Sequence, residues 1–390
     1  MNSPLIRTNT RPHKGLLPFL KNAWQGFYEP FKADTQLFWV TLALCVFGLL
    51  VLFSASAHYG AELNDSKLYF VLRQALYMAV GFLLMWILAG FKEARLKQRV
   101  WVFAWVTLGL LLLTQWVGDT ANGSERWLSI GPIRFQTSEL AKPAVALLLA
   151  WALSDQSHRR LERVVTASVM CLAIIGLIFK QPNLSITLLL SSAFLGVTFM
   201  AGAPTWLYVG GLPLGFWLLF EKIKHTPYQW RRIEGWLNPW NDPQDVGYNI
   251  IQSFYAISSG GLLGTGYGNS VQKLFYLPFQ HTDFIFAIIC DELGFLGAMV
   301  TLSFYGWLAL RGFNISRSAE TPFKQLLAFA LTWMLVVQAV INISVAIGLF
   351  PVTGVTLPLI SYGGTSVVVT LGMIGLLFSL LQREKSVHTI

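Results

Sequence analysis

Long runs of apolar residues, separated by short polar stretches, constrain this sequence more than any other feature. A helix rises about 1.5 Å per residue, so about 20 consecutive apolar residues cross a bilayer. Hydrophobic residues make up 54% of the 390 residues and charged residues only 12%, which is too little charge for the surface of a soluble domain. The sequence therefore predicts an all-α integral membrane protein.

The apolar runs predict a bundle of about ten transmembrane helices. The fourth and seventh runs are short enough to be tilted, partly buried or re-entrant. The ten expected spans are 37–56, 69–90, 100–118, 140–154, 163–179, 184–202, 205–220, 284–310, 326–348 and 363–381.

Lysine and arginine residues predict the orientation. Most of the 28 fall on the cytosolic side, as cytosolic loops prefer, if both termini are cytosolic. One large polar loop, 221–283, then lies on the outer face between the seventh and eighth helices. The expected organisation is a basic tail over 1–36, a single membrane domain over 37–382 and a second tail over 383–390. The net charge of +9 follows from this topology, so no nucleic-acid partner is expected.

The cysteines and histidines do not indicate redox or metal chemistry. Cys45, Cys171 and Cys290 all fall in apolar spans, so the outer loops have no thiol for a disulfide framework. The six histidines have no metal-ligand spacing.

Polar residues inside apolar spans are costly and mark structural or functional sites. Glu139 and Lys142 are three residues apart on one face of the fourth span, where they can pair. A buried structural ion pair is the favoured interpretation. Gln338 and Asn342 are four apart on the ninth span, where interhelical hydrogen bonds explain them.

The outer loop contains a glycine-rich stretch. Residues 260–268 are Gly-Gly-Leu-Leu-Gly-Thr-Gly-Tyr-Gly, without the Gly-Lys-Ser/Thr ending of a phosphate-binding loop. Glycines here allow backbone N–H groups to approach an anionic head group, or they form a simply mobile turn. The sequence leaves both alternatives open.

Ordered motifs along almost the whole chain resemble the FtsW/RodA/SpoVE family of SEDS proteins. The resemblance is closer to the division branch of that family than to its elongation branch, because of the Asn-Gly start of the first motif and the basic N-terminal extension. The motifs are Asn-Gly-Ser-Glu-Arg-Trp (122–127), Phe-Gln-Thr-Ser-Glu-Leu-Ala-Lys (135–142), Gly-Tyr-Asn-Ile-Ile-Gln-Ser (247–253), Gln-Lys-Leu-Phe-Tyr-Leu-Pro (272–278), His-Thr-Asp-Phe-Ile-Phe-Ala (281–287), Asp-Glu-Leu-Gly-Phe-Leu-Gly (291–297), Gly-Leu-Phe-Pro-Val-Thr-Gly (348–354) and Leu-Pro-Leu-Ile-Ser-Tyr-Gly-Gly-Thr-Ser (357–366).

The resemblance implies a peptidoglycan glycosyltransferase of the bacterial cytoplasmic membrane. Such an enzyme polymerises lipid II into glycan strands at the outer face, here during cell division at the septum. The resemblance also implies a cognate class B penicillin-binding protein, a transpeptidase, as partner, together with other membrane proteins of the division machinery. Two alternatives stay open. They are a lipid II flippase, whose essential charges would lie near the midplane, and a non-catalytic division scaffold that recruits the transpeptidase.

Asp283 is the candidate catalytic base. Joining a sugar hydroxyl to an anomeric carbon needs a base, but the undecaprenyl diphosphate leaves without protonation, so one carboxylate suffices. Asp283 lies where the outer loop meets the eighth span, and the family's proposed catalytic aspartate falls on the same His-Thr-Asp motif. The alternative role is a helix N-cap. Asp291 and Glu292 lie about 12 and 13 Å further along a helix. Glu292 therefore cannot share the reaction centre directly, and Asp291 is expected to be a structural group or one that supports the site indirectly.

The diphosphate needs positive charge, either from basic side chains or from a divalent cation, Mg or Mn, shared by Asp283 and the lipid. Lys273 is preferred because it lies in a family motif close to Asp283, and Arg231 and Arg232 are further candidates. The other predicted substrate-binding residues lie in or beside the matching motifs: Arg126, Glu139, Lys142, Gln252, Ser253, His281, Thr282 and Ser361.

Three departures from the family pattern limit what the resemblance implies. Phe279 stands where the family usually has an acidic residue after the Leu-Pro pair. The family motif Pro-Asp-x-Gly-Thr is replaced by Pro-Asn-Leu-Ser-Ile over 182–186. Ser-Glu over 124–125 replaces a commonly small-then-basic pair. None of these changes touches Asp283 or Lys273.

Overall fold

The structure of the chain is a computed structural model. Most of the predicted N-terminal tail and the whole predicted C-terminal tail lie outside the described residues. Those residues are 28–382, with gaps at 122–123, 132, 156, 158–159 and 182.

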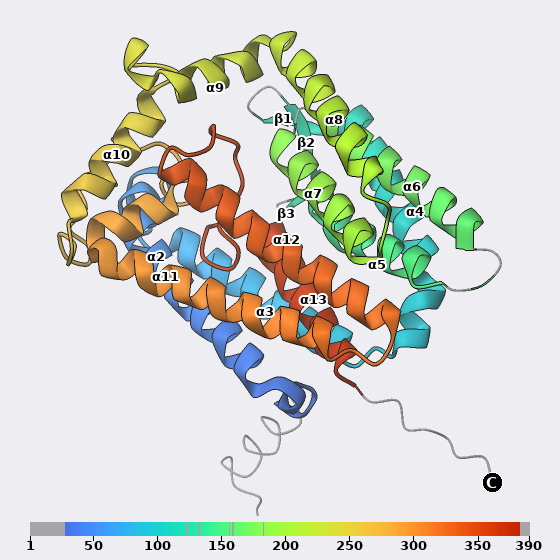
Figure 1. Cartoon of the computed structure of the whole chain (residues 1–390). Coiled ribbons are helices and arrows are strands. Elements are labelled where there is room, and N and C mark those ends of the chain that lie inside the picture. Colours follow the sequence, from blue (N-terminus) through green and yellow to red (C-terminus); the bar gives the residue numbers. More distant parts are fainter. Residues whose placement is uncertain are drawn as a thin grey trace, which may run out of the picture.

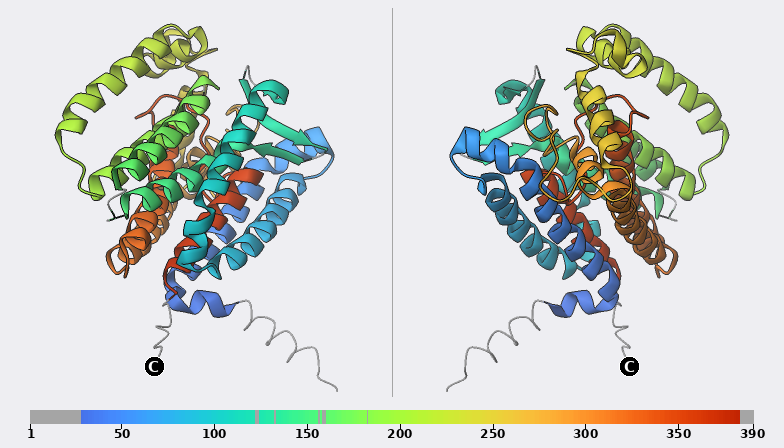
Figure 2. Two further views of the ribbon diagram at one scale, coloured as in Figure 1. Left: turned by 90° about the vertical axis from the view of Figure 1, so that its right-hand side faces the viewer. Right: turned by 90° about the vertical axis from the view of Figure 1, so that its left-hand side faces the viewer.

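This part of the chain is almost entirely helical, and the long helices lie side by side as a bundle (Figures 1 and 2). The elements in chain order are η1 (Glu29–Asp34), α2 (Thr35–Asn64), α3 (Tyr69–Ala89), α4 (Glu93–Val117), β1 (Asp119–Ala121), β2 (Ser124–Ile130), β3 (Ile133–Gln136), α5 (Thr137–Leu153), α6 (Arg160–Lys180), α7 (Leu184–Met200), α8 (Trp206–Lys224), α9 (Pro227–Leu237), η2 (Pro239–Asn241), α10 (Tyr248–Gly260), α11 (Ile285–Arg317), α12 (Pro322–Ala346) and α13 (Gly364–Leu380).

Each of the ten predicted spans overlaps one of these helices. Six of them, α2, α3, α4, α6, α11 and α12, are long and apolar enough to cross a membrane, and α7 and α13 are shorter apolar helices. The two remaining helices, α5 and α8, are the fourth and seventh predicted spans. α5 has 17 residues and carries Glu139 and Lys142 near its start, whereas α8 carries Lys222 and Lys224 in its last turn. The side of the membrane on which each end lies stays a prediction.

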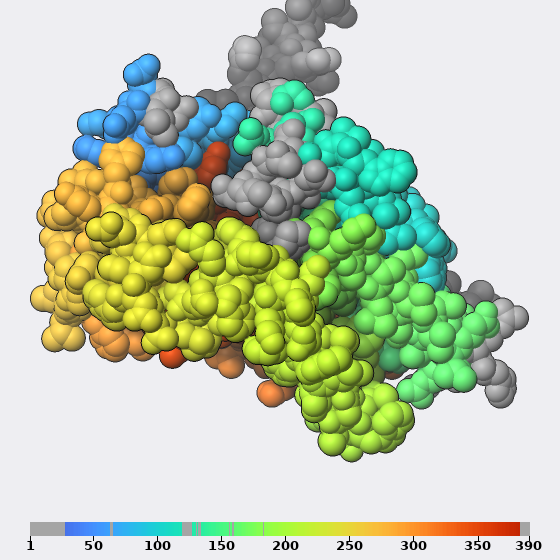
Figure 3. All heavy atoms as spheres, turned by 90° about the horizontal axis from the view of Figure 1, so that it is seen from above, coloured from blue at the N-terminus to red at the C-terminus, as the bar shows by residue number. Residues whose placement is uncertain are grey.

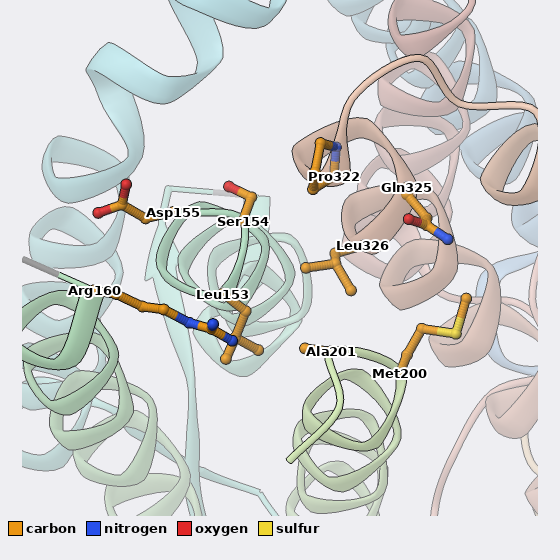
Figure 4. Close-up of a pocket in the computed structure, with 9 residues that line it drawn as sticks. All are labelled: Leu153, Ser154, Asp155, Arg160, Met200, Ala201, Pro322, Gln325 and Leu326. Carbon is orange, nitrogen blue, oxygen red and sulfur yellow. The ribbon is translucent and has the colours of Figure 1, made fainter. Parts of the chain in front are cut away.

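The connections alternate between the two ends of the bundle. At one end, α5, α7 and α12 meet around a pocket of about 170 Å³, where Leu153, Met200 and Pro322 lie close together (Figure 4). Asp283 precedes α11 at the opposite end, because α11 ends and α12 begins on the pocket side (Figure 1). The pocket is therefore separate from the predicted catalytic site.

The last residues of the predicted N-terminal tail pack against the bundle. The ring of Phe31 is fully buried, with its centroid 5.1 Å from that of Phe38 and 4.9 Å from that of Phe378. The buried carboxylate of Asp34 accepts a hydrogen bond from Arg311 Nη2 at 2.6 Å. These contacts join η1 to the helical bundle.

A small antiparallel sheet, in the order β1-β2-β3, lies in the connection between α4 and α5. The sequence analysis predicted no strands in this connection. β2 and β3 form a hairpin around Gly131, which adopts a left-handed φ of 60°. The Gln136 N–H donates to Thr365 Oγ1 at 3.2 Å, which joins the sheet to the start of α13.

α8 stands apart from the rest of the bundle (Figure 2). Of its 19 residues only Ile223 is buried, and large apolar side chains such as Trp206, Phe216 and Trp217 are exposed. α8 packs against α9, and Tyr208 donates a hydrogen bond to Thr198 of α7 at 3.0 Å. Such an unburied apolar helix suits contact with lipid.

α11 is broken near its start. Gly294 has φ 65° and ψ −161°, which interrupts the helical hydrogen bonds. The N–H groups beyond the break bond to the outer loop instead: Phe295 donates to the Gly261 carbonyl at 2.9 Å and Leu296 to the Leu262 carbonyl at 3.3 Å. Carbonyl groups of the glycine-rich stretch therefore accept the hydrogen bonds that the preceding turn of α11 would otherwise accept.

The glycine-rich stretch over 260–268 serves this close backbone packing. A Cβ on Gly264 would lie 2.1 Å from the carbonyl oxygen of Glu292, and the Gly266 N–H donates to the same oxygen at 3.1 Å. Neither predicted alternative, an anion cradle or a mobile turn, describes this arrangement.

We expect Gly264→Ala to destabilise the fold more than Gly268→Ala. Both glycines have a left-handed φ, 83° and 84°, so each alanine costs about 1–2 kcal/mol of backbone strain. Only the Cβ at position 264 also meets backbone, whereas Gly268 faces open space. Thermal unfolding of the purified protein in detergent measures the difference. Equal melting temperatures for the two variants would show that the contact with α11 is unimportant.

Candidate active site

Asp283 lies directly before α11, with its side chain half-buried. The N-cap residue of α11 is Phe284, and no side chain caps the helix. The alternative prediction that Asp283 acts as an N-cap is therefore wrong. Its carboxylate is not used by the first turn of the helix, so it remains available for chemistry.

The backbone of the His-Thr-Asp motif is held by residues far along the chain. The carbonyl groups of 281–283 each accept one hydrogen bond. Their donors are, in chain order, the Tyr362 N–H at 2.9 Å, Ser361 Oγ at 2.6 Å and Asn342 Nδ2 at 2.9 Å. The end of α12 and the connection before α13 thus fix the position of the Asp283 carboxylate.

A second stretch, residues 352–356, lies against Asp283, and we call it the Gly354 segment. Gly354 has a left-handed φ of 76°, and a Cβ built on it would lie 3.7 Å from Asp283 Oδ2. Asn342 Nδ2 also donates to the Val355 carbonyl at 2.7 Å. One amide therefore joins the Gly354 segment to Asp283.

Three further side chains, each from a different part of the bundle, bind carbonyl groups of the Gly354 segment. They come from α9, the first turn of α7 and α12, so the position of the segment depends on all three helices. The bonds are Arg232 Nη1 to the Val352 carbonyl at 3.0 Å, Ser185 Oγ to the Thr353 carbonyl at 2.6 Å and Gln338 Nε2 to the Thr356 carbonyl at 3.0 Å.

The pKa of Asp283 suits a general base. Burial raises the pKa of this carboxyl from 3.8 to about 6, while the positive charge of Arg232 and a hydrogen bond from Thr282 lower it. A base is most effective when its pKa lies near the working pH. Asp283 is therefore ionised at neutral pH and still basic enough to accept a proton.

His281 packs as a neutral ring. Its centroid lies 4.9 Å from that of Phe70, 5.2 Å from that of Tyr59 and 6.0 Å from that of Tyr362. Burial lowers the pKa of His281 to about 4, so the imidazole is uncharged at neutral pH. The geometry assigns it a packing role beside Asp283.

The structure does not bring the predicted ligand Lys273 to Asp283. Its buried ammonium lies 2.9 Å from Glu292 Oε1 and 3.1 Å from Ser54 Oγ. Glu292 lies about 10 Å along α11 from Ile285. Binding of a diphosphate by Lys273 would require this ion pair to open.

The two arginines of α9 differ in their surroundings. Arg231 forms an exposed ion pair with Asp245, where solvent screens the interaction. Arg232 lies over the ring of Tyr228 at 4.6 Å and reaches the Gly354 segment. α9 and α10 lie across this end of the molecule (yellow in Figure 3). Arg232 is therefore the predicted basic residue that the structure brings to Asp283.

The predicted pair between Glu139 and Lys142 is confirmed. The carboxylate and the ammonium are 2.5 Å apart and buried. Lys142 Nζ also donates to Gln338 Oε1 at 2.8 Å, which confirms interhelical bonding by Gln338. Gln338 also binds the Thr356 carbonyl. The Glu139–Lys142 pair is therefore linked to the Gly354 segment through Gln338.

Asp291 is structural, as the sequence predicted. Its two carboxylate oxygens accept hydrogen bonds from Ser259 and Ser270, each at 2.5 Å. These bonds tie α10 and the outer loop to the first part of α11. The arrangement leaves Asp283 as the carboxylate at the entry to that helix.

The remaining predicted residues are spread over several elements. Ser253 Oγ donates to the Ala346 carbonyl at 2.6 Å and so joins α10 to α12. Gln252 is half-buried on α10. Arg126 lies in β2, and its side chain is outside the described part of the structure. Ser361 uses its hydroxyl within the protein, since it also accepts from the Leu357 N–H at 2.9 Å.

The sequence analysis did not include Ser185 or Gly354 among the site residues. Gly354 ends a matched motif and Ser185 lies in a departure from the family pattern, but neither feature indicated proximity to Asp283. Asn342 was predicted to make interhelical hydrogen bonds, but it donates to carbonyl groups in the connections before α11 and before α13. Its two carbonyl partners show that it organises the site.

A divalent cation fits this site only if it is shared with the substrate. Within the described ranges, no group of three or more His, Cys, Asp or Glu side chains could hold a metal ion. Magnesium commonly takes one or two carboxylates and completes its shell with phosphate oxygens and water. Asp283 fits that pattern as the carboxylate ligand.

Comparison with known proteins identifies the family. The FtsW/RodA/SpoVE profile, described as "Cell cycle protein", matches residues 35–386. The chain belongs to this family. It is 37% identical over 370 residues to the probable peptidoglycan glycosyltransferase FtsW of Thioalkalivibrio sulfidiphilus, covering 90% of each chain. It is 35% identical over 365 residues to the corresponding protein of Legionella pneumophila, covering 90% of this chain and 91% of that one.

Two solved structures of the FtsW/RodA/SpoVE type share the fold. One is a chain of a peptidoglycan synthase complex that coordinates polymerization and crosslinking, with a TM-score of 0.74, 31% identity, and coverage of 89% of this chain and 97% of that one. The other is the rod shape determining protein RodA of Thermus thermophilus, with a TM-score of 0.67, 29% identity, and coverage of 89% and 95%. This chain therefore shares the fold of both structures over 89% of its length.

We expect Lys273→Met to destabilise the protein, because it leaves Glu292 buried without a counter-charge. Breaking a buried pair from one side costs about 3–5 kcal/mol, whereas replacing both partners by apolar residues is often close to neutral. The double variant Lys273→Met, Glu292→Leu should therefore recover most of the stability. Unfolding in detergent measures both, with Arg231→Met in the exposed pair as the control. If Lys273→Met unfolded at the same temperature as the wild type, the structural role of Lys273 would be contradicted.

Proposed function

We propose that this protein is a peptidoglycan glycosyltransferase that polymerises lipid II at the outer face of the bacterial cytoplasmic membrane. The observation that carries the proposal is Asp283, a carboxylate with a raised pKa, free of the helix cap and fixed at one end of the bundle. The relatives named as probable peptidoglycan glycosyltransferases support the same activity.

The chemistry follows from one base and one leaving group. Asp283 accepts the proton of the acceptor sugar hydroxyl while that oxygen attacks the anomeric carbon of the donor. The bond from the anomeric carbon to the diphosphate breaks, and its electron pair leaves with the undecaprenyl diphosphate. Arg232 supplies positive charge beside the site. A divalent cation held between Asp283 and the diphosphate would neutralise the leaving group further.

The proposal includes a division role and a partner. The FtsW names of the relatives favour septal wall synthesis, and the similarity to a chain of a peptidoglycan synthase complex favours a class B penicillin-binding protein as the partner. Other division membrane proteins are further expected partners. A lipid II flippase and a non-catalytic scaffold are the alternatives. In the pairs Glu139–Lys142 and Lys273–Glu292 each charge is neutralised by its partner. These charges are therefore not available to bind a transported substrate, which argues against a flippase.

The direct test is polymerisation of labelled lipid II by the protein in complex with a cognate transpeptidase whose own active site is blocked. Asp283→Asn should reduce strand formation by at least about 100-fold, the usual worth of a general base. Asp245→Asn, in the exposed ion pair of the same outer loop, is the control and should retain activity. Absence of strands from a folded wild-type complex would favour flipping or scaffolding. If Asp283→Asn still formed strands, the protein would remain a polymerase but Asp283 would not be its base.

The pH dependence of polymerisation should report Asp283. The folded-state pKa lies above 3.8, at about 6, and the base works only when ionised, so kcat/KM should rise with pH to a plateau with a midpoint near 6. Arg232→Gln should move this midpoint upward, because the positive charge that lowers the pKa is lost. Arg231→Gln, one residue away and paired with Asp245, should leave it unchanged. Identical midpoints in all three proteins would contradict the electrostatic role of Arg232.

A further inference from the structure

Ser185 makes a contact that the family pattern does not provide. It lies in the first turn of α7, which is capped by Asn183, and it is 1% exposed. Its hydroxyl donates to the Thr353 carbonyl at 2.6 Å. Glycine, the residue of the family motif at this position, has no side chain for such a bond. The serine that replaces the family's glycine at this position therefore adds one hydrogen bond to the Gly354 segment.

The Thr353 carbonyl belongs to the peptide group that leads into Gly354. A peptide group is planar and trans, so its C=O and N–H point in opposite directions. Because Ser185 fixes the Thr353 carbonyl, it also fixes the direction of the Gly354 N–H, which points away from α7. In the described part of the structure, this N–H has no hydrogen-bond partner.

The same peptide lies beside the proposed base. The Cβ position of Gly354 is 3.7 Å from Asp283 Oδ2, and Gly354 is exposed. A glycine with a left-handed φ has more backbone freedom than any other residue. The carbonyls of Val352 and Val355 are held by Arg232 and Asn342. Two peptide planes lie between them, one on each side of Gly354, and Ser185 holds the first of these, Thr353–Gly354.

We propose that Ser185 is a positioning residue that fixes the Thr353–Gly354 peptide beside Asp283. It thereby holds the Gly354 N–H as a donor for an oxygen of the bound lipid-linked sugar. A backbone donor fixed before the substrate arrives stabilises developing negative charge without reorganisation. This inference rests on the proposed glycosyltransferase activity.

The test uses variants of Ser185 in the complex with the blocked transpeptidase. Ser185→Ala and Ser185→Gly should each lower kcat for labelled lipid II by about 3- to 10-fold, the worth of one neutral hydrogen bond, whereas Ser185→Thr keeps a hydroxyl and should recover most of the rate. Thr187→Val is the matched control, because the Thr187 hydroxyl bonds within α7, to the Asn183 carbonyl at 2.9 Å. It should retain the wild-type kcat.

Hydrogen exchange of the peptide over 349–358 provides a readout besides activity. Exchange should rise in Ser185→Ala and Ser185→Gly and stay at the wild-type level in Ser185→Thr and Thr187→Val. Wild-type kcat in Ser185→Ala, or an equal loss in Thr187→Val, would overturn the positioning role while leaving the polymerase intact. An inactive wild-type complex would instead overturn the proposed function, and the exchange data would then still show whether Ser185 holds the segment.

Discussion

The amide of Asn342 is the interaction on which the site depends. One NH₂ group donates to the carbonyl of Asp283 and to that of Val355, so it joins two connections that approach α12 from different directions. Asp283 precedes α11 and Val355 lies between α12 and α13, so both carbonyls lie outside helices, and two acceptors cannot bond each other. A buried amide with two donors meets this requirement. The Asn342 amide therefore joins three parts of the chain beside the Asp283 carboxylate: the residues before α11, the Gly354 segment and the end of α12.

The buried charges of the bundle are also paired with partners. Lys142 is balanced by Glu139 and Lys273 by Glu292, each within 3 Å, as expected where a lone charge in an apolar interior is costly. These pairs join helices and loops, and each ammonium group has a carboxylate as its partner. Asp283 differs because burial raises its pKa and its neighbours only partly compensate. The carboxylate of Asp283 is therefore the one we propose as the base.

The break in α11 shows how the outer loop is held to the bundle. A continuous helix would use its own N–H groups, whereas the turn at Gly294 leaves some of them for the loop carbonyls of Gly261 and Leu262. The glycines of the loop permit that approach because they have no Cβ. The outer loop is thereby fixed to the same helix that begins beside Asp283. Loop geometry and active-site geometry are consequently coupled through one element.

The sequence by itself determined the helices and the local contacts. The apolar runs predicted the ten helices that overlap the expected spans, because a bilayer admits little else, but not α9 and α10 of the outer loop. The three-residue spacing predicted the pair Glu139–Lys142, and the position of Asp283 at the start of a span marked it as a candidate base. Only the tertiary structure decided which distant groups meet. Lys273 bonds Glu292 rather than Asp283, Gly354 lies beside Asp283, and Ser185 binds the carbonyl of Thr353, the residue before Gly354. Helical periodicity describes neighbours within one element, whereas these contacts depend on how separate helices and connections pack.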